Sequence, residues 1–130
     1  MPGQYQKLHE HIAVHRYYLG QRESREIFGF VSLDGRHRFL ALHELTLGTR
    51  TQAPVDAAEL FRLALLDRAC GVLLFHNHPS GEIEPSRDDL ALTRRLVDGG
   101  RTLEVAVHDH LIVADNRWMS IRSARSDVFA

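Results

Sequence analysis

The sequence is poor in cysteine, with Cys70 the only one among 130 residues. A single cysteine excludes an intrachain disulfide, and it also excludes a zinc site built from several thiolates. Histidine is plentiful by comparison, with nine residues, and there are 17 aspartates and glutamates. Any metal site must therefore use imidazole and carboxylate ligands, which are typical of hydrolytic centres.

Long apolar runs are also missing. No stretch approaches the roughly 20 apolar residues that span a bilayer, and the N-terminal segment MPGQYQKLHEHIAVHR lacks the basic and apolar regions of a signal peptide. We therefore expect a cytoplasmic protein that does not enter a membrane. The formal net charge is -1, so there is no excess of positive charge to attract nucleic acid, and a nucleic-acid partner is not favoured.

Repeats, low-complexity tracts and linkers are absent from the sequence. A chain of 130 residues has the usual size of one domain. We therefore expect residues 1–130 to form a single domain. The edges of a small sheet can pair with a second copy, which makes a homodimer compatible with the sequence.

Apolar periodicity predicts strands and helices in alternation. Residues 8–19 alternate loosely and carry the β-branched and aromatic residues that strands favour. We expect a β-hairpin over 25–48 that turns at Asp34-Gly35, helices over 55–69 and 86–100, and strands over 71–76, 103–115 and 117–122. From the hairpin onward, the order β-β-α-β-α-β-β predicts an α/β (α+β) fold with a mixed β-sheet packed between helices.

Two histidines lie two residues apart at the end of the strand expected over 71–76. His76 and His78 project to the same side, because alternate residues of a strand share a face. The turn PSGEIEP then leads to Ser86, at the expected N-cap of a helix, and to Asp89 in its first turn. Two imidazoles and a carboxylate are the protein ligands of a catalytic zinc site, whose fourth position is left to water.

The same residues also have a purely structural interpretation. Ser-x-x-Asp before an apolar helix is a capping box, which is common in proteins that bind nothing, and His-x-His also occurs as a polar strand end. Asp88 competes with Asp89 as a ligand on spacing, although it should face solvent if Asp89 faces the site. The residues alone therefore leave metal binding and helix capping both open.

The letters of His76-Asn77-His78 also suggest an HNH nuclease. An HNH nuclease spreads its named residues over a ββα-metal unit of some tens of residues. The adjacency of the three residues here argues against that function.

The segment HNHPSGEIEPSRDD resembles the His-x-His, seven residues, Ser-x-x-Asp signature of the JAB1/MPN/Mov34 metalloenzymes, the JAMM motif. The wording HNHPSG with PSRDD is typical of the RadC branch. The likeness extends over about residues 24–121, through REIFGFVSLDGRHRFL, LGT and DHLIVAD. This resemblance to a RadC-like JAMM metalloprotease-like domain implies a cytidine-deaminase-like JAB/MPN fold.

The resemblance implies a zinc metallopeptidase that cleaves a peptide or isopeptide bond in a peptide or protein substrate. His76, His78 and Asp89 correspond to the ligands of about one Zn2+ ion per chain. Glu26 corresponds to the general base that acts on the zinc-bound water. Ser86 would donate a hydrogen bond to the developing oxyanion.

Several other residues have two interpretations each. Asp109 and His110 match the Asp-His pair of RadC proteins, and they either orient a metal ligand or support the fold. His108 repeats the two-residue spacing with His110 on a strand expected beside the site. Glu23 competes with Glu26 for the role of base. Cys70, Phe61, Phe75 and Trp118 are most simply core residues.

Three functions therefore compete: a metallopeptidase, a nucleic-acid-processing or DNA-repair-associated factor, and a non-catalytic MPN interaction module. Full-length RadC proteins carry a helical N-terminal region, and the roughly 23 residues before the match are too few to hold one, which weighs against a DNA-binding role. The presence of all four motif residues weighs against a module that has lost catalysis.

Overall fold

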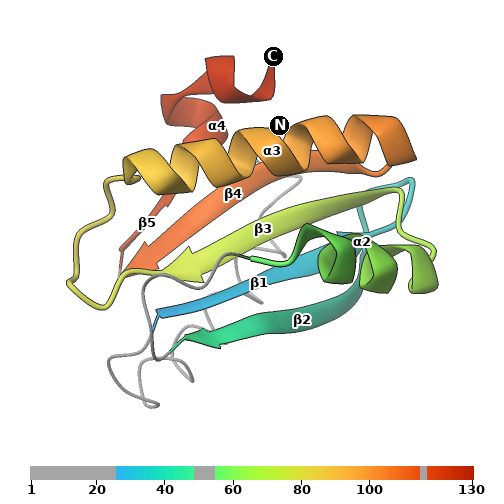
Figure 1. The fold of residues 1–130 in the computed structure, drawn as a ribbon, viewed down its shortest axis with the longest axis horizontal. Helices are drawn as coiled ribbons and strands as arrows, with labels where there is room; N and C mark the ends of the chain where they lie inside the picture. Colours follow the sequence, from blue (N-terminus) through green and yellow to red (C-terminus); the bar gives the residue numbers. More distant parts are fainter. Residues whose placement is uncertain (1–25, 49–54, 115–116) are drawn as a thin grey trace.

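The computed structural model describes residues 26–48, 55–114 and 117–130. These form a five-stranded mixed sheet of order β2-β1-β3-β4-β5 with helices packed on it (Figure 1). The strands are β1 (Glu26–Leu33), β2 (Phe39–Gly48), β3 (Gly71–Asn77), β4 (Ala106–Ala114) and β5 (Arg117–Ser120). The helices are α2 (Ala57–Leu66), α3 (Arg87–Leu103), α4 (Ile121–Ala124) and the 3-10 helix η2 (Ser126–Phe129). The predicted α/β (α+β) class with a mixed sheet is confirmed, and so is the predicted order of elements from β1 to β5. The strand expected over 117–122 ends at Ser120, and the short helices α4 and η2 that follow it are not predicted. The segment 8–19 lies outside the described residues.

The strand directions follow from the lengths of the connections. β1 and β2 form the predicted antiparallel hairpin, and its turn is held by Asp34, whose Oδ1 accepts hydrogen bonds from the backbone N–H groups of Arg36 and Arg38. β3 runs antiparallel to β1 but parallel to β4. Parallel strands need a long crossover connection, and α3 provides it. The carboxyl end of β3 therefore lies beside the start of α3 (Figure 1).

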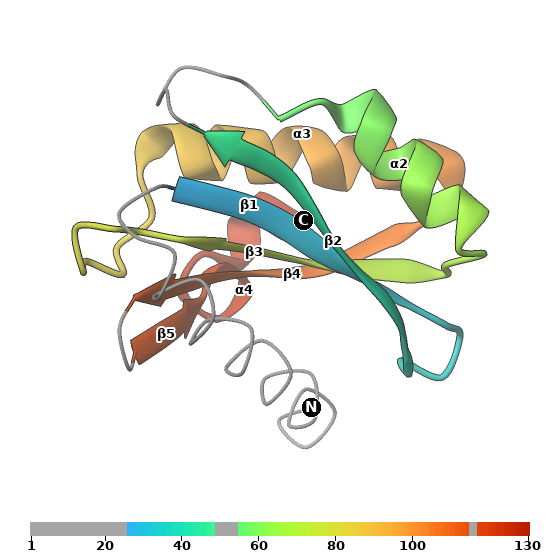
Figure 2. The same cartoon turned by 90° about the horizontal axis from the view of Figure 1, so that it is seen from below.

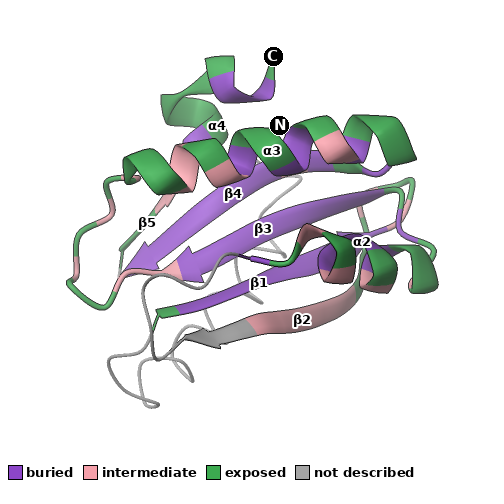
Figure 3. Ribbon diagram, in the orientation of Figure 1, coloured by how far each residue is buried: buried purple, intermediate pink, exposed green. Residues whose placement is uncertain are grey.

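The apolar core is divided between the two faces of the sheet. On one face, residues of β1, β3 and β4 pack against residues of α2, α3, α4 and η2, among them Phe30, Leu74, Leu60 and Leu96. Figure 2 shows α2 and α3 on this same side of the strands. The second cluster includes Leu73 and further residues of β1, β3 and β4. Figure 3 shows the result, with β1, β3 and β4 almost entirely buried and the outer faces of the helices exposed.

α3 is longer than the sequence predicts. The expected end at Gly99-Gly100 is wrong, because the helix continues to Leu103 and ends at Glu104 in the left-handed conformation. A side chain at position 100 would overlap the backbone carbonyl of Val105, so glycine here permits close packing rather than ending the helix. None of the described helices, α3 included, is long and apolar enough to cross a membrane.

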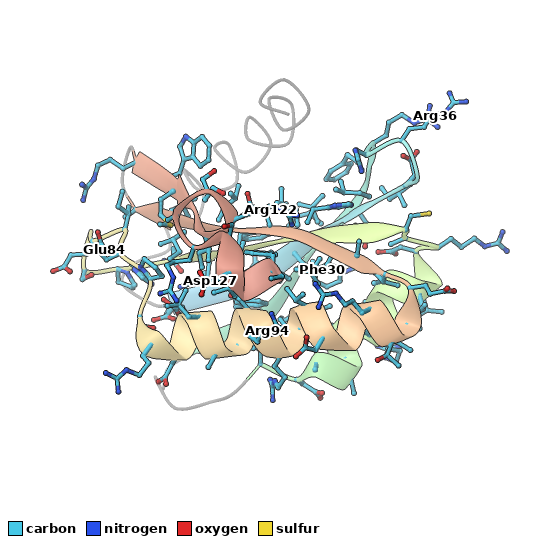
Figure 4. The ribbon with its side chains drawn as sticks, turned by 90° about the horizontal axis from the view of Figure 1, so that it is seen from above. Phe30, Arg36, Glu84, Arg94, Arg122 and Asp127 are labelled. Carbon is cyan, nitrogen blue, oxygen red and sulfur yellow. The ribbon has the colours of Figure 1, made fainter. Side chains whose placement is uncertain are left out.

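Arginines of α3 hold the carboxyl-terminal segment. The Arg94 guanidinium donates to the backbone carbonyls of Val128 and Ala130, at 3.3 and 2.7 Å, and Arg101 donates to that of Phe129. Figure 4 shows Arg94 beside the turn that carries Asp127. The head group of Arg94 therefore joins α3 to the carboxyl-terminal segment.

Two residues expected in the core are exposed. Trp118 is 43% exposed because it lies on β5, the edge strand of the sheet. Cys70 is also exposed, although its backbone is bonded to Leu33 and Ala106 on the neighbouring strands. Phe61 and Phe75 are buried as predicted.

Candidate metal centre

Two histidines lie at the carboxyl end of β3. His76 is the penultimate residue of the strand, and His78 follows its last residue, Asn77. Both imidazoles turn to the same side, as strand alternation predicts, and their Nε2 atoms lie 2.8 Å apart. The side chain of His76 is 2% exposed and that of His78 is 14% exposed, so the pair lies at the boundary between core and solvent.

Asp89 reaches these histidines from the first turn of α3. Its backbone N–H donates to Ser86 Oγ at 3.0 Å, and its Oδ2 accepts from the backbone N–H of Ser86 at 2.8 Å, so the predicted capping box is present. The same carboxylate lies 3.1 Å from His78 Nε2 and 3.3 Å from His76 Nε2. Capping and clustering with histidine, which the sequence leaves as alternatives, occur together.

The three side chains form a group that is able to hold a metal ion. His76, His78 and Asp89 each offer one ligand atom, and these atoms lie within 4.8 Å of one another. No other group of this kind occurs among residues 26–48, 55–114 and 117–130. Two imidazoles and a carboxylate suit zinc with one position left open, while the identity of the ion stays a prediction.

Charge within the cluster favours the ionised carboxylate. Burial by itself raises the pKa of the Asp89 carboxyl, but the adjacent imidazoles of His76 and His78 hold that pKa well below its usual range. The hydrogen bond to Asp89 in turn raises the pKa of His78, against the opposing effect of burial. A metal ion requires the carboxylate in the deprotonated form that this environment stabilises.

The carbonyl of Glu82 fixes the orientation of His78. His78 Nδ1 lies 2.8 Å from Glu82 O, and a carbonyl oxygen can only accept, so the hydrogen is on Nδ1. Nε2 of the neutral ring then keeps a lone pair directed toward His76 and Asp89. A ring nitrogen that donates to the backbone while the other faces the site is typical of metal-ligating histidines.

His110 lies directly behind His76. Its Nε2 is 2.7 Å from His76 Nδ1, and its Nδ1 is 2.6 Å from the hydroxyl of Thr93. The ring of His110 is fully buried, and burial lowers its pKa well below the ordinary value. One member of the predicted Asp-His pair therefore contacts the cluster.

The other member of the pair supports the fold. Asp109 is buried, and its carboxylate accepts hydrogen bonds from Ser120 Oγ at 2.6 Å and from the backbone N–H of Arg122 at 3.0 Å. Burial raises the pKa of Asp109, with these hydrogen bonds acting in the opposite direction. Asp109 thus organises the start of α4 and makes no direct contact with the histidines of the cluster.

The spacing of His108 is misleading. The pairing of β3 with β4 shifts by one residue at this point, so His108 is an extra residue in β4. Its ring lies against that of His37 in the hairpin turn, with 4.6 Å between ring centroids. His108 therefore belongs to the hairpin end of the sheet, while His110 belongs to the cluster.

Glu26 is the exposed first residue of β1. Phe28 pairs with His76 across the two antiparallel strands, and residues two apart share a face. Glu26 therefore lies on the same face as both histidines and opposite the position of His78. The Glu26 carboxylate also contributes to the raised pKa of His78. The competing candidate Glu23 lies outside the described residues.

The family to which the whole sequence belongs agrees with the metal-binding cluster. Residues 6–126 match the RadC-like JAB domain family. The chain belongs to this family. The matched region is longer than the 24–121 expected from motifs alone, and it includes every residue of the metal-binding group.

Curated relatives of this RadC-like JAB domain are longer proteins. A UPF0758 protein of Alcanivorax borkumensis is 45% identical over 98 residues, which cover 75% of this chain and 44% of the relative. A UPF0758 protein of Xanthomonas oryzae pv. oryzae is 40% identical over 111 residues, with 84% and 49% covered. One of Cyanothece sp. is 38% identical over 100 residues, with 77% and 41% covered. The chain therefore spans less than half the length of these relatives.

Three residues beside the cluster are not identified by the motif. The Phe28 ring stacks on His76 and meets the edge of His110, with 6.2 and 5.6 Å between centroids. Asn77 Oδ1 accepts a hydrogen bond from the backbone N–H of Ile27 and so joins β1 to the end of β3. Thr93 contacts His110 from α3. The sequence indicates Thr93 only through its position one helical turn after Asp89.

Proposed function

We propose that this RadC-like JAB domain is a zinc-dependent hydrolase that cleaves peptide or isopeptide bonds. The observation that carries the proposal is the convergence of ligand atoms from His76, His78 and Asp89 within 4.8 Å of one another. These three residues would hold the ion. Zinc, when bound, supplies Lewis acidity, which polarises a substrate carbonyl and lowers the pKa of coordinated water to about 7.

Glu26 would carry the proton. Its carboxylate is exposed on the face of the sheet that bears the histidines, so it is open to water and substrate. There it can accept a proton from the attacking water and return it to the leaving amine, which must be protonated to depart. A positioned base of this kind contributes about 10²–10⁴-fold to the rate.

Ser86 would stabilise the oxyanion. Its Oγ accepts the backbone N–H of Asp89, which fixes the position of the oxygen. A hydroxyl that accepts one hydrogen bond still has its own hydrogen to donate, and the exposed position of Ser86 makes that hydrogen available to a substrate. Removal of one oxyanion donor typically costs about 10²–10³ in kcat.

A peptide or protein is the substrate that this chemistry fits. The formal net charge of -1 gives no general attraction to a polyanion, so a nucleic-acid partner remains disfavoured. A cytoplasmic location and a homodimer stay predictions.

The proposal is tested by peptide cleavage. Zinc-loaded protein is incubated with a mixed-sequence peptide library and with lysine-linked isopeptides, and products are detected by mass spectrometry. We expect cleavage by the wild type, loss on chelation, and a fall of about 10²–10⁴-fold in Glu26→Gln with zinc retained. Glu23→Gln is the matched control and should remain active. Absence of cleavage of both substrate classes by fully zinc-loaded protein would overturn the proposed hydrolase while leaving the metal site intact.

A further inference from the structure

We propose that Thr93 and His110 are positioning residues that hold His76 in the tautomer whose Nε2 lone pair faces the metal site. This inference rests on the metal site of the proposed function, but it does not depend on hydrolysis. The contacts that carry it form an unbroken chain from the backbone of Asp89 through Thr93 and His110 to His76.

Thr93 determines which atoms donate and which accept in this series of hydrogen bonds. Its Oγ1 lies 2.7 Å from the backbone carbonyl of Asp89, and because a carbonyl oxygen cannot donate, the hydroxyl must. A threonine has one hydroxyl hydrogen, so Thr93 can only accept in its second contact, 2.6 Å from His110 Nδ1. His110 therefore carries a hydrogen on Nδ1.

The same reasoning continues to His76. A neutral His110 with a hydrogen on Nδ1 has a lone pair on Nε2, which lies 2.7 Å from His76 Nδ1. His76 must donate in this contact, so its hydrogen is on Nδ1 as well. Nε2 of His76 is then the ligand atom, and it lies 2.8 Å from His78 Nε2 and 3.3 Å from the Asp89 carboxylate.

The opposite arrangement fails on hydrogen-bond count. If His110 donated from Nε2, its Nδ1 would need the hydroxyl hydrogen of Thr93. The contact between Thr93 and the Asp89 carbonyl would then join two oxygens with no hydrogen between them. His76 would also carry its hydrogen on Nε2, which removes the lone pair that a metal ion needs. Only the first arrangement therefore satisfies all three contacts between the Asp89 carbonyl and His76 Nδ1.

This series of hydrogen bonds connects two of the three proposed metal ligands. Asp89 supplies a carboxylate to the cluster and a backbone carbonyl to Thr93, four residues along α3. Thr93 and His110 are fully buried, so water cannot replace either contact cheaply. The placement of α3 thus determines both the position of Asp89 and the tautomer of His76.

The test combines tautomer assignment with metal affinity. Long-range 1H–15N spectra of metal-free protein should show both His76 and His110 with the hydrogen on Nδ1. In Thr93→Val the hydroxyl is replaced by a methyl group of similar size, and we expect His110 to shift toward the Nε2–H form. Zinc affinity, measured by competition with a chromogenic chelator, should fall about 10–100-fold. Thr93→Ser should restore both readouts.

Two further variants separate positioning from general destabilisation. Thr102→Val removes a hydroxyl from the same helix, where it contacts the Asp98 carbonyl far from the cluster, and should bind zinc as the wild type does. Val97→Ala weakens the core under α3 and should leave the tautomers unchanged. A hydrogen on Nε2 of His110 in the metal-free wild type, or wild-type zinc affinity in Thr93→Val, would overturn the inference. The spectra need neither metal nor substrate, so failure of the proposed hydrolysis cannot be mistaken for failure here.

Discussion

Asp89 Oδ2 accepts the backbone N–H of Ser86 at 2.8 Å and lies 3.1 Å from Nε2 of His78. One oxygen atom thus takes part in both the helix cap and the candidate metal site. The cap aligns the first turn of α3 with the end of β3, and that alignment brings the carboxylate to the histidines. Substitutions at this position should therefore have two effects that can be measured separately.

The first prediction separates those effects. Asp89→Asn and Asp89→Ala should both lose zinc, because neither supplies an anionic ligand. Asn keeps an amide oxygen that can accept the Ser86 N–H, so metal-free Asp89→Asn should unfold with a free energy about 1 kcal/mol higher than Asp89→Ala. Metal analysis and urea unfolding provide the two readouts. Asp88→Ala is the matched control, since Asp88 is exposed, and zinc loss in that variant would contradict the assignment.

The second prediction concerns Ser86. Ser86→Ala removes the cap and should cost about 1 kcal/mol of stability, whereas Ser86→Gly should cost only about a few tenths. Both variants lack the hydroxyl, so peptide cleavage should fall about 10²–10³-fold in each. Cleavage at the wild-type rate by Ser86→Gly would show that the hydroxyl does not serve as an oxyanion donor.

The third prediction tests the packing of β1. A methyl group at position 29 would overlap the His43 carbonyl and the Phe75 ring, so Gly29→Ala should lower the free energy of unfolding by about 2 kcal/mol. At Gly35 the nearest atom to an added Cβ is Cys70 Sγ, at 3.7 Å, which is an ordinary contact. Gly35→Ala is therefore the control, and equal stability of the two variants would show that the strands do not pack as described.

The fourth prediction is a pH dependence that arises at the hairpin end of the sheet. Burial, followed by the charges of His37 and Arg122, lowers the pKa of His108 to about 4 from an ordinary value of 6.5. Between these two pH values the unfolded chain binds the proton and the folded chain does not, so His108 destabilises the fold as pH falls from about 6.5 to about 4. His108→Gln cannot titrate and should be spared about 2 kcal/mol of that loss. If the free energy of unfolding falls by the same amount in both proteins between pH 7.5 and pH 4.5, this account is contradicted.

The sequence was informative where a pattern reports local structure. Strand alternation predicts that His76 and His78 share a face, and the Ser86 cap predicts the placement of Asp89 on α3. The structure confirms this clustering. It could be predicted because both features depend on residues close in the chain. The mixed sheet likewise follows from the order of the elements.

The remainder depends on contacts between distant segments. The register shift at His108 separates it from His110, and no spacing in the sequence reports such a shift. Gly100 permits a close contact with the backbone of Val105 rather than ending a helix, which becomes visible only once α3 and its connection to β4 are packed. The contact of Thr93 with His110 joins α3 to β4 and could not be predicted from either segment alone.

The most direct test of the central claim is metal content. Protein purified without chelator or metal-affinity tag is analysed by plasma mass spectrometry, comparing the wild type with His78→Ala and Glu26→Gln. We predict about one zinc ion per chain in the wild type and in Glu26→Gln, and none above background in His78→Ala. Folded wild-type protein that contains no metal and takes up none from added zinc would contradict the account.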